Sequence, residues 1–227
     1  MLTADGFFPS LFSVPVSNRR MLARWLPMIS AAARRRMVLA SGNPGKLKEY
    51  QLLATGHPLV LELQPGFAHI PEFPEDALTF AENAAGKALY YSKYCDELVF
   101  EDDSGLVVPS LGGAPGVQSA RYAGVGASND AKISKLLGAL QGKHGPERVA
   151  YFVCVIAVAR CGNCVAVVSG KVVGEILQSP QGTSGFGYDP VFYFPPLAKT
   201  FAELSPEEKN QHSHRGKAFR RLMEVLS

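Results

Sequence analysis

The order of apolar segments constrains the fold of this chain more than any other feature of its sequence. In the first half, short apolar runs alternate with stretches of helical periodicity; the runs are 37–41, 59–63 and 98–100, and the helical stretches are 44–54 and 77–94. Three β-rich runs follow later, at 149–160, 164–178 and 188–194. Alternation that gives way to clustered strands predicts an α/β fold with a mixed sheet.

Between and after these runs we expect further loops and helices, and none of them divides the chain into separate domains. A Gly- and Pro-rich loop at 109–126 precedes an expected helix at 129–141. Ser205-Pro206-Glu207-Glu208 has the pattern of a capping box with proline in the first turn, and GKAFRRLMEVL then predicts a closing amphipathic helix. No internal repeat or linker interrupts residues 37–227, so we expect one domain there.

Residues 1–36 differ in composition from the rest and are expected to form a separate extension. They hold six arginines and one acid, Asp5, which is typical of an organellar transit peptide. A disordered arm, or a true start at Met28 or Met37, fits as well. Because a complete domain begins at Met37, we expect a cytoplasmic protein, or an organellar one if the extension is a transit peptide.

Charge and hydropathy exclude two classes of partner. Without residues 1–36 the chain holds 17 basic and 19 acidic residues, which does not favour binding to nucleic acid. The longest apolar run, 151–159, is shorter than the roughly 20 residues that cross a bilayer, so we expect no membrane partner.

The four cysteines include a C-G-N-C stretch at 161–164, which invites a zinc or redox interpretation. It lies between two strand-like runs, where Gly162-Asn163 is typical of a hairpin turn. A zinc ribbon would need a second pair of cysteines. We therefore expect free thiols in a reducing compartment.

Two segments have the residue types that hold phosphate and a divalent cation. SGNPGK, at 41–46, lies between a strand and a helix, so Ser41, Asn43 and Lys46 are placed to cradle phosphates, although a capped turn would look the same. Glu75 and the run Glu101-Asp102-Asp103, after the expected strand 98–100, favour Mg²⁺ completed by substrate phosphates; a solvated acidic turn is the alternative.

Two later segments have the residue types that read a flat ligand. In SGFGYDP, at 184–190, glycines flank Phe186, whose ring offers a stacking face, and Asp189 can accept hydrogen bonds from ring N–H groups. His214 and Arg215 supply donors before the last helix. A Gly-rich turn around a packed ring, and a helix cap with a surface arginine, are the simpler interpretations of these two segments.

Taken in order, these motifs resemble the inosine/xanthosine triphosphate pyrophosphatase family over about residues 38–219. The motifs that carry the resemblance are ASGNPGK, LTFAENAAGKA, DDSGL with LGGAPG and SARYAG, SGFGYDPVF, and SHRGKA. The resemblance implies an elongated, twisted mixed sheet flanked by helices, with two lobes around a central cleft. It also implies hydrolysis of ITP, dITP and XTP to the monophosphate and pyrophosphate, with Mg²⁺ as cofactor and a homodimer as the assembly.

The resemblance also implies roles for individual residues. Asp103 would be the general base, and the metal ligands would be Glu75, Asp102 and Asp103. The implied substrate-binding residues are Ser41, Asn43, Lys46, Lys87, Ser104, Phe186, Gly187, Tyr188, Asp189, Lys209, His214 and Arg215. Glu101 lies outside the motif and receives no role. Gln118 stands where we expect an aromatic residue and His212 where we expect an aliphatic one, which leaves the fine specificity open.

Two other functions remain compatible with parts of the sequence. A pyrophosphatase for methylated or pyrimidine nucleotides, like the septum-formation inhibitor family, would have a similar cleft, but SGFGYDP and SHRGKA argue against it. A non-catalytic nucleotide-binding module would keep the pocket without the chemistry, whereas the intact pair Asp102-Asp103 favours an enzyme.

Overall fold

The structure is a computed structural model that describes residues 35–42 and 44–227. The predictions for residues 1–34 and for Asn43 therefore lie outside the described residues. Arg35 and Arg36, which we assigned to the extension, are instead the first residues of a strand. Residues 36–227 form one compact unit. No helix in the described part of the chain combines the length and the apolar character needed to cross a membrane.

Within the described residues, seven strands form one sheet in the order β2-β1-β3-β4-β5-β6-β7. The strands are β1 (Arg35–Leu39), β2 (Leu59–Leu63), β3 (Leu98–Val107), β4 (Val149–Arg160), β5 (Asn163–Ile176), β6 (Phe192–Phe194) and β7 (Lys199–Thr200). β1 pairs with β3 in parallel, whereas each neighbouring pair from β3 to β7 is antiparallel. The predicted α/β fold with a mixed sheet is confirmed.

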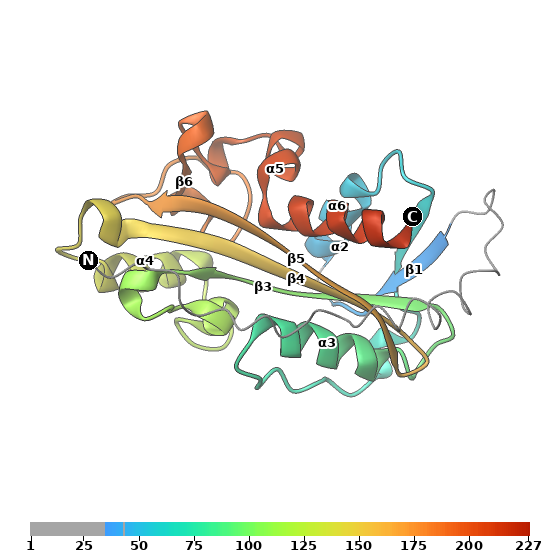
Figure 1. The fold of residues 1–227 in the computed structure, drawn as a ribbon. Helices are drawn as coiled ribbons and strands as arrows, with labels where there is room; N and C mark the ends of the chain where they lie inside the picture. The colour runs from blue at the N-terminus through green and yellow to red at the C-terminus, as the bar shows by residue number, and fades with distance from the viewer. Residues whose placement is uncertain (1–34, 43) are drawn as a thin grey trace, which may run out of the picture. The chain divides into compact units, whose positions relative to one another are not determined.

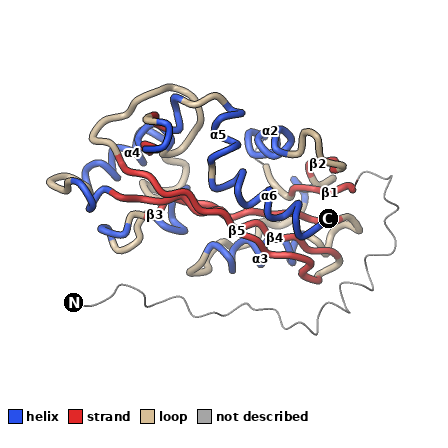
Figure 2. Tube along the Cα trace, turned by 45° about the horizontal axis from the view of Figure 1, so that its top comes forward, coloured by secondary structure: helices blue, strands red, loops and turns tan. Residues whose placement is uncertain are grey.

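Helices cover both faces of this sheet. They are α2 (Pro44–Leu53), α3 (Phe80–Tyr91), α4 (Asn129–Ala139), α5 (Pro206–His212) and α6 (His214–Leu226). In both views, α2 and α6 lie on the face of the long strands opposite α3 (Figures 1 and 2). Successive side chains of β4 point to opposite faces of the sheet. Ile156 therefore packs with α2 and α6, while Ala157 packs with α3.

Short polar side chains set where several helices begin. The Thr79 hydroxyl accepts a hydrogen bond from the Glu82 amide, so α3 begins after Thr79 and not at residue 77 as predicted. Ser205 and Glu208 form the predicted capping box at the start of α5. Ser213 caps α6 by accepting from the Gly216 amide, so the closing helix starts two residues earlier than predicted.

Two large hydrophobic clusters lie toward opposite ends of the long strands, in agreement with the two lobes we expected. One contains Phe100 of β3 and packs β1 and α2 against α6. The other contains Leu106 of β3 and packs α4 against the C-terminal half of the sheet. Residues 101–105 of β3 lie between the two clusters, and this polar stretch positions the site.

The acids of β3 are inside the strand, so the prediction that they follow its end is wrong. Pairing with β4 continues from Val99 to Val107 and includes Asp102 opposite Ile156. The parallel neighbour β1, however, pairs only as far as Leu39 opposite Phe100. From Glu101 to Leu106, that edge of β3 pairs with no strand of the described chain and is open to side chains from helices and loops; at Val107 it forms a bridge with Pro115.

The remaining β-rich runs match the prediction closely but not completely. A two-residue hairpin turn joins β4 to β5 at Cys161 and Gly162, both with positive φ, one position before the turn we expected. All four cysteines are free thiols. The run 188–194 divides into the 3₁₀ helix η7 (Asp189–Val191) and the short strand β6.

The predicted loops also contain 3₁₀ turns. They are η3 (Phe67–His69), η4 (Pro109–Leu111), η5 (Gly116–Arg121), η6 (Gly145–Arg148), η8 (Pro195–Leu197) and η9 (Phe201–Glu203). Short 3₁₀ turns are common as connectors between longer elements.

Candidate active site

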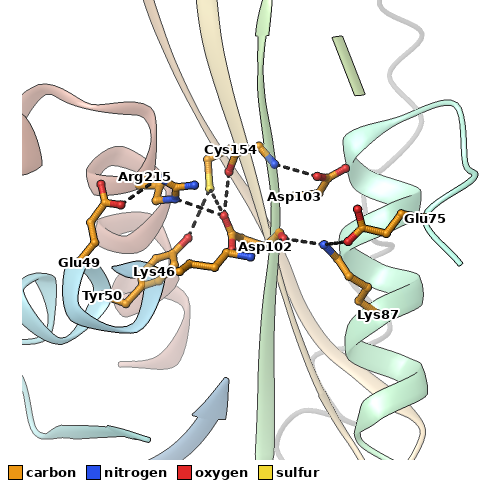
Figure 3. A network of polar contacts seen from close by, with 10 residues as sticks. Lys46, Glu49, Tyr50, Glu75, Lys87, Asp102, Asp103, Cys154 and Arg215 are labelled. Atoms are coloured by element: carbon orange, nitrogen blue, oxygen red, sulfur yellow. Dashed lines mark hydrogen bonds and ion pairs between the residues drawn. The ribbon is translucent and has the colours of Figure 1, made fainter. Parts of the chain in front are cut away.

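Asp102 is the centre of a buried charge network on the face of β3 that α2 and α6 cover (Figure 3). Its carboxylate is ion-paired with the Lys46 ammonium at Oδ1 and lies 3.3 Å from the Arg215 Nε at Oδ2. The Ser104 hydroxyl donates to Oδ2 at 2.7 Å. Burial alone would raise the pKa of Asp102, but the two cations outweigh it and hold this pKa well below its usual range.

Arg215 links α6 to α2 through a second carboxylate. Its Nη1 lies 2.9 Å from Glu49 Oε2, and both side chains are nearly buried. Burial opposes the charge of the guanidinium, yet Glu49 and Asp102 together raise the pKa of Arg215 well above its usual value. Sequence reasoning missed Glu49; the signal was its place three residues after Lys46, on the same face of a helix.

Tyr50 and Cys154 close this network on its buried side. The Tyr50 hydroxyl lies 3.6 Å from the Cys154 sulfur, which is 3.8 Å from Asp102 Oδ2. Burial, together with the charge of Asp102, raises the pKa of the Cys154 thiol to about 12. The thiol therefore stays protonated and can donate to the carboxylate.

Asp103 projects from the opposite face of β3, toward α3 (Figure 3). The Asn83 amide donates to its Oδ2 at 3.0 Å, and the Ser104 amide donates to Oδ1 at 3.0 Å. Burial raises the pKa of Asp103 despite the nearby ammonium of Lys87. A carboxylate with a raised pKa suits proton abstraction better than an ordinary aspartate does.

Lys87 ties α3 to β3 and to the loop that holds Glu75. Its Nζ lies 2.6 Å from Glu75 Oε1 and donates to the Asp102 carbonyl at 2.9 Å. Burial would lower the pKa of Lys87, but the carboxylates of Glu101, Glu75 and Asp103 raise it. Lys46 approaches the same Asp102 carbonyl at 3.2 Å, so two ammonium groups from different helices converge on one residue of the strand.

Glu101 occupies the same face of β3 as Asp103 but is completely buried. Its Oε1 has no hydrogen-bond partner, while the Ala40 amide donates to the carboxylate. Burial raises the pKa of Glu101 to about 8, against the attraction of Lys46 and Lys87. This residue is the one for which the sequence motif provided no role.

A second group of residues surrounds the ring of Phe186, which is half-exposed. The Lys209 Nζ lies 4.7 Å and the Arg215 guanidinium carbon 5.1 Å from the ring centroid. Asp189 accepts from Lys209 at 2.7 Å and from the Phe186 amide at 2.9 Å. Gly185 has a φ of +76°, and a Cβ there would lie 2.3 Å from the Asp189 carboxylate, so only glycine fits.

The remaining predicted site residues have different environments. Tyr188 is buried in the hydrophobic cluster that contains Leu106, and its hydroxyl donates to the Ser119 carbonyl. Its side chain therefore supports the pocket from the protein interior. The His214 ring is buried and stacked on Phe152 at 4.7 Å. Burial and the neighbouring cations lower the pKa of His214, which makes it a neutral imidazole. Ser41 lies two residues after the end of β1 at Leu39, and Gly187 has a φ of +63°.

The three predicted metal ligands lie on two sides of β3. Among the described residues, no group of three or more His, Cys, Asp and Glu side chains could hold a metal ion. Asp102 faces away from Asp103 and is ion-paired with Lys46 and Arg215. Glu75 and Asp103 remain on the side of α3, and Mg²⁺ commonly takes one or two carboxylates and completes its shell with water and phosphate oxygens.

A mixed α/β sheet that gathers lysines, an arginine and buried carboxylates beside a half-exposed aromatic ring is the framework of a nucleotide-processing enzyme. The comparison with known protein families agrees. The chain belongs to the Ham1 family, whose profile matches residues 37–225.

Curated relatives cover almost the same part of the chain. The dITP/XTP pyrophosphatase of Shouchella clausii is 45% identical over 190 residues, which are 84% of this chain and 96% of that protein. The dITP/XTP pyrophosphatase of Geobacillus kaustophilus is 47% identical over 188 residues, 83% of this chain and 92% of that protein.

Solved structures confirm the fold. A HAM1 protein from Coxiella burnetii superposes with a TM-score of 0.77 at 43% identity, covering 85% of this chain and 98% of that one. A nucleoside-triphosphatase / dITP/XTP pyrophosphatase from Mycobacterium abscessus gives a TM-score of 0.66 at 36% identity, covering 85% and 100%.

Proposed function

We propose that this protein hydrolyses non-standard purine nucleoside triphosphates, such as dITP, ITP and XTP, to the monophosphate and pyrophosphate. The names of its relatives support this activity. The observation that carries the proposal is the convergence of Lys46 and Lys87 on Asp102, which precedes Asp103 in β3. Arg215 contacts both the Asp102 carboxylate and the ring of Phe186. A triphosphate needs cations along its tail, a base for water and a surface for its purine.

Asp103 is the general base of the proposed reaction. Its carboxylate is oriented by Asn83 and by the Ser104 amide, and burial raises its pKa. It removes a proton from the water that attacks the α-phosphorus, a contribution of about 10² to 10⁴ in rate. Lys46 and Lys87 stabilise the negative charge that builds on the phosphoryl oxygens during the attack.

Glu75 and Asp103 are the residues that would hold Mg²⁺. When bound, the ion polarises phosphoryl oxygens and lowers the pKa of coordinated water. For Asp102, whose role as a metal ligand stays a prediction, we propose a positioning role. Its carboxylate, ion-paired with Lys46 and Arg215, sets the positions of the cation that contacts phosphate and the cation that contacts the purine.

The purine is read by the residues around Phe186. Its ring stacks on the base, while Lys209, Arg215 and the neutral His214 face the edge of the purine together with Asp189. A 6-oxo group accepts hydrogen bonds that the 6-amino group of adenine cannot accept, so adenine leaves buried donors unpaired, at a cost of about 1 to 3 kcal/mol each. Ser41, Asn43 and Gly187 would complete the contacts with phosphate and base.

The assembly and the location stay predictions of the resemblance. We propose a homodimer that acts without nucleic acid or membrane, and a cytoplasmic location unless residues 1–36 are a transit peptide. Sedimentation of the purified protein tests the first, and microscopy of a C-terminally tagged chain tests the second.

The decisive experiment is a pyrophosphate-release screen on ITP, dITP, XTP, ATP, GTP, dUTP and methylated UTP, with and without Mg²⁺. We expect Mg²⁺-dependent release from the first three. The variant Asp103→Asn should lose most turnover and still bind ITP, because the amide keeps the size but cannot take a proton. Asp130→Asn, at an exposed position in α4, is the control. Preference for dUTP, or full activity of Asp103→Asn, would contradict the proposal.

A further inference from the structure

Arg121 has no part in the function proposed above, but its side chain contacts the proposed metal ligand Glu75. It is the last residue of η5, which packs directly on β3. Gly105 makes this possible, since a Cβ there would lie 2.5 Å from the Ser119 hydroxyl and 2.6 Å from the Gly116 carbonyl. The Leu106 amide donates to the Ser119 hydroxyl at 2.9 Å and attaches η5 to the strand.

Arg121 contacts both the backbone and the side chain of Glu75. Its Nη2 donates to the Glu75 carbonyl, and its Nη1 lies 4.0 Å from Oε2. Lys87 binds the other carboxylate oxygen, Oε1, at 2.6 Å. Residues 71–79 around Glu75 have no helix or strand of their own, so contacts of this kind decide where the carboxylate lies.

Gln118 orients the guanidinium of Arg121. The Arg121 Nε donates to Gln118 Oε1 at 2.6 Å. Side chains three residues apart are eclipsed in a 3₁₀ helix, which brings these two together on one turn. Gln118 stands where we expected an aromatic residue, and its amide oxygen supplies this acceptor to the guanidinium.

We propose that Arg121 is a positioning residue that holds Glu75 for the divalent cation, and that Gln118 aligns Arg121 for this task. The proposal rests on the function proposed above and adds two residues to its metal site. Two effects of Arg121 oppose each other: its charge repels a cation, whereas its hydrogen bond to the Glu75 backbone preorganises a ligand. We expect preorganisation to prevail, because the guanidinium is one-third exposed and its charge is screened, while loss of an outer partner weakens metal binding by about 10- to 100-fold.

The test measures Mn²⁺ binding to the purified protein from the electron paramagnetic resonance of the free ion. We expect Arg121→Ala to raise the Kd for Mn²⁺ about tenfold and Arg121→Lys to raise it almost as much, because lysine keeps the charge but lacks the fork of donors. Gln118→Leu should raise it about two- to threefold, in line with one exposed hydrogen bond, and Gln118→Glu should not raise it. The matched control is Arg221→Ala, which removes an exposed arginine of α6 that donates to the Ser169 carbonyl of β5.

Kinetics distinguishes positioning from a direct part in the reaction. For Arg121→Ala, the Mg²⁺ concentration at half-maximal rate should rise about tenfold, while kcat at saturating Mg²⁺ and ITP stays close to the wild-type value. Unchanged or tighter Mn²⁺ binding in both Arg121 variants would overturn the inference. So would a large fall in kcat at saturation, because Arg121 would then act on the substrate. A wild-type protein that takes up no Mn²⁺ would instead refute the proposed metal site itself.

Discussion

Glu101→Gln should make the protein more resistant to unfolding at alkaline pH, because Glu101 is a buried carboxyl group whose pKa is raised to about 8. The folded state keeps the proton on this group at a pH at which the unfolded chain, with a pKa near 4.5, has lost it. Stability therefore falls as pH rises from about 4.5 to about 8 and then levels off. Glutamine has nearly the same shape and does not titrate, so the variant lacks this decline.

The size of the effect follows from the shift in pKa. One unit corresponds to about 1.4 kcal/mol, so the full decline amounts to at most about 5 kcal/mol. Between pH 6 and pH 9 the variant should gain about 2 to 3 kcal/mol in its free energy of unfolding relative to the wild type. The amide also places a donor where Oε1 has no partner, and this cost is the same at every pH. The change between the two pH values is thus the quantity to measure.

Urea unfolding at pH 6 and pH 9, with divalent ions chelated, provides that quantity. Circular dichroism is the suitable probe, since the only tryptophan, Trp25, lies outside the described residues. Glu62→Gln serves as the control, because Glu62 is an exposed glutamate on β2 whose loss should change stability equally at both pH values. A constant difference between wild type and Glu101→Gln across this pH range would refute the reasoning.

Three further predictions test other parts of the structure. Phe186→Leu should lower kcat/KM for ITP about tenfold, since stacking of a base on a ring is worth about 1 to 3 kcal/mol; an unchanged KM in steady-state assays would exclude the ring as a substrate contact. Arg215→Lys should lower the midpoint of thermal unfolding by about 10 °C. One ammonium then replaces a guanidinium buried between two carboxylates, which lowers the free energy of unfolding by about 3 kcal/mol. A shift below about 2 °C in calorimetry would count against a buried ion pair. Removing residues 1–34 should leave kcat/KM with ITP within about twofold of the full-length value. Removing residues 1–36 should destabilise the protein, because Arg35 and Arg36 belong to β1. A large loss of activity after removal of residues 1–34 alone would make the arm part of the enzyme.

Local patterns in the sequence predicted most of the elements correctly, because they depend on neighbours along the chain. The runs that became β2 and β4 match the strands to the residue, and the capping box at Ser205 is formed as expected. The hairpin turn after β4 is displaced by one position. The observed start of a helix differs from the predicted one where a capping side chain determines it. The Thr79 hydroxyl caps α3, so the helix begins at the next residue.

The structure arranges the predicted site residues in a way that the motifs did not indicate. The motifs named Asp102 and Asp103 together, yet adjacent residues of a strand point to opposite faces. The sequence did not indicate this alternation, because the acids were expected to follow the end of the strand. Glu49, Arg121 and Gln118 received no role from the sequence. Glu49 and Arg121 contact residues distant in sequence, Arg215 and Glu75, and Gln118 contacts the side chain of Arg121.

The sequence by itself determined the α/β class, the order of the strands and helices, and the residue types that can bind a triphosphate and a purine, since periodicity and motif chemistry are properties of neighbouring residues. Only the tertiary structure decided that β3 continues past the end of β1, so that its acids lie at an open strand edge between two hydrophobic clusters. Which cation meets which carboxylate there depends on burial and on contacts between residues up to 166 positions apart in the chain, such as Glu49 and Arg215. Desolvation and pairing of charge arise only when those residues meet. They give Glu101, Asp102 and Asp103 three different environments, in which the pKa of Glu101 and of Asp103 is raised and that of Asp102 is lowered.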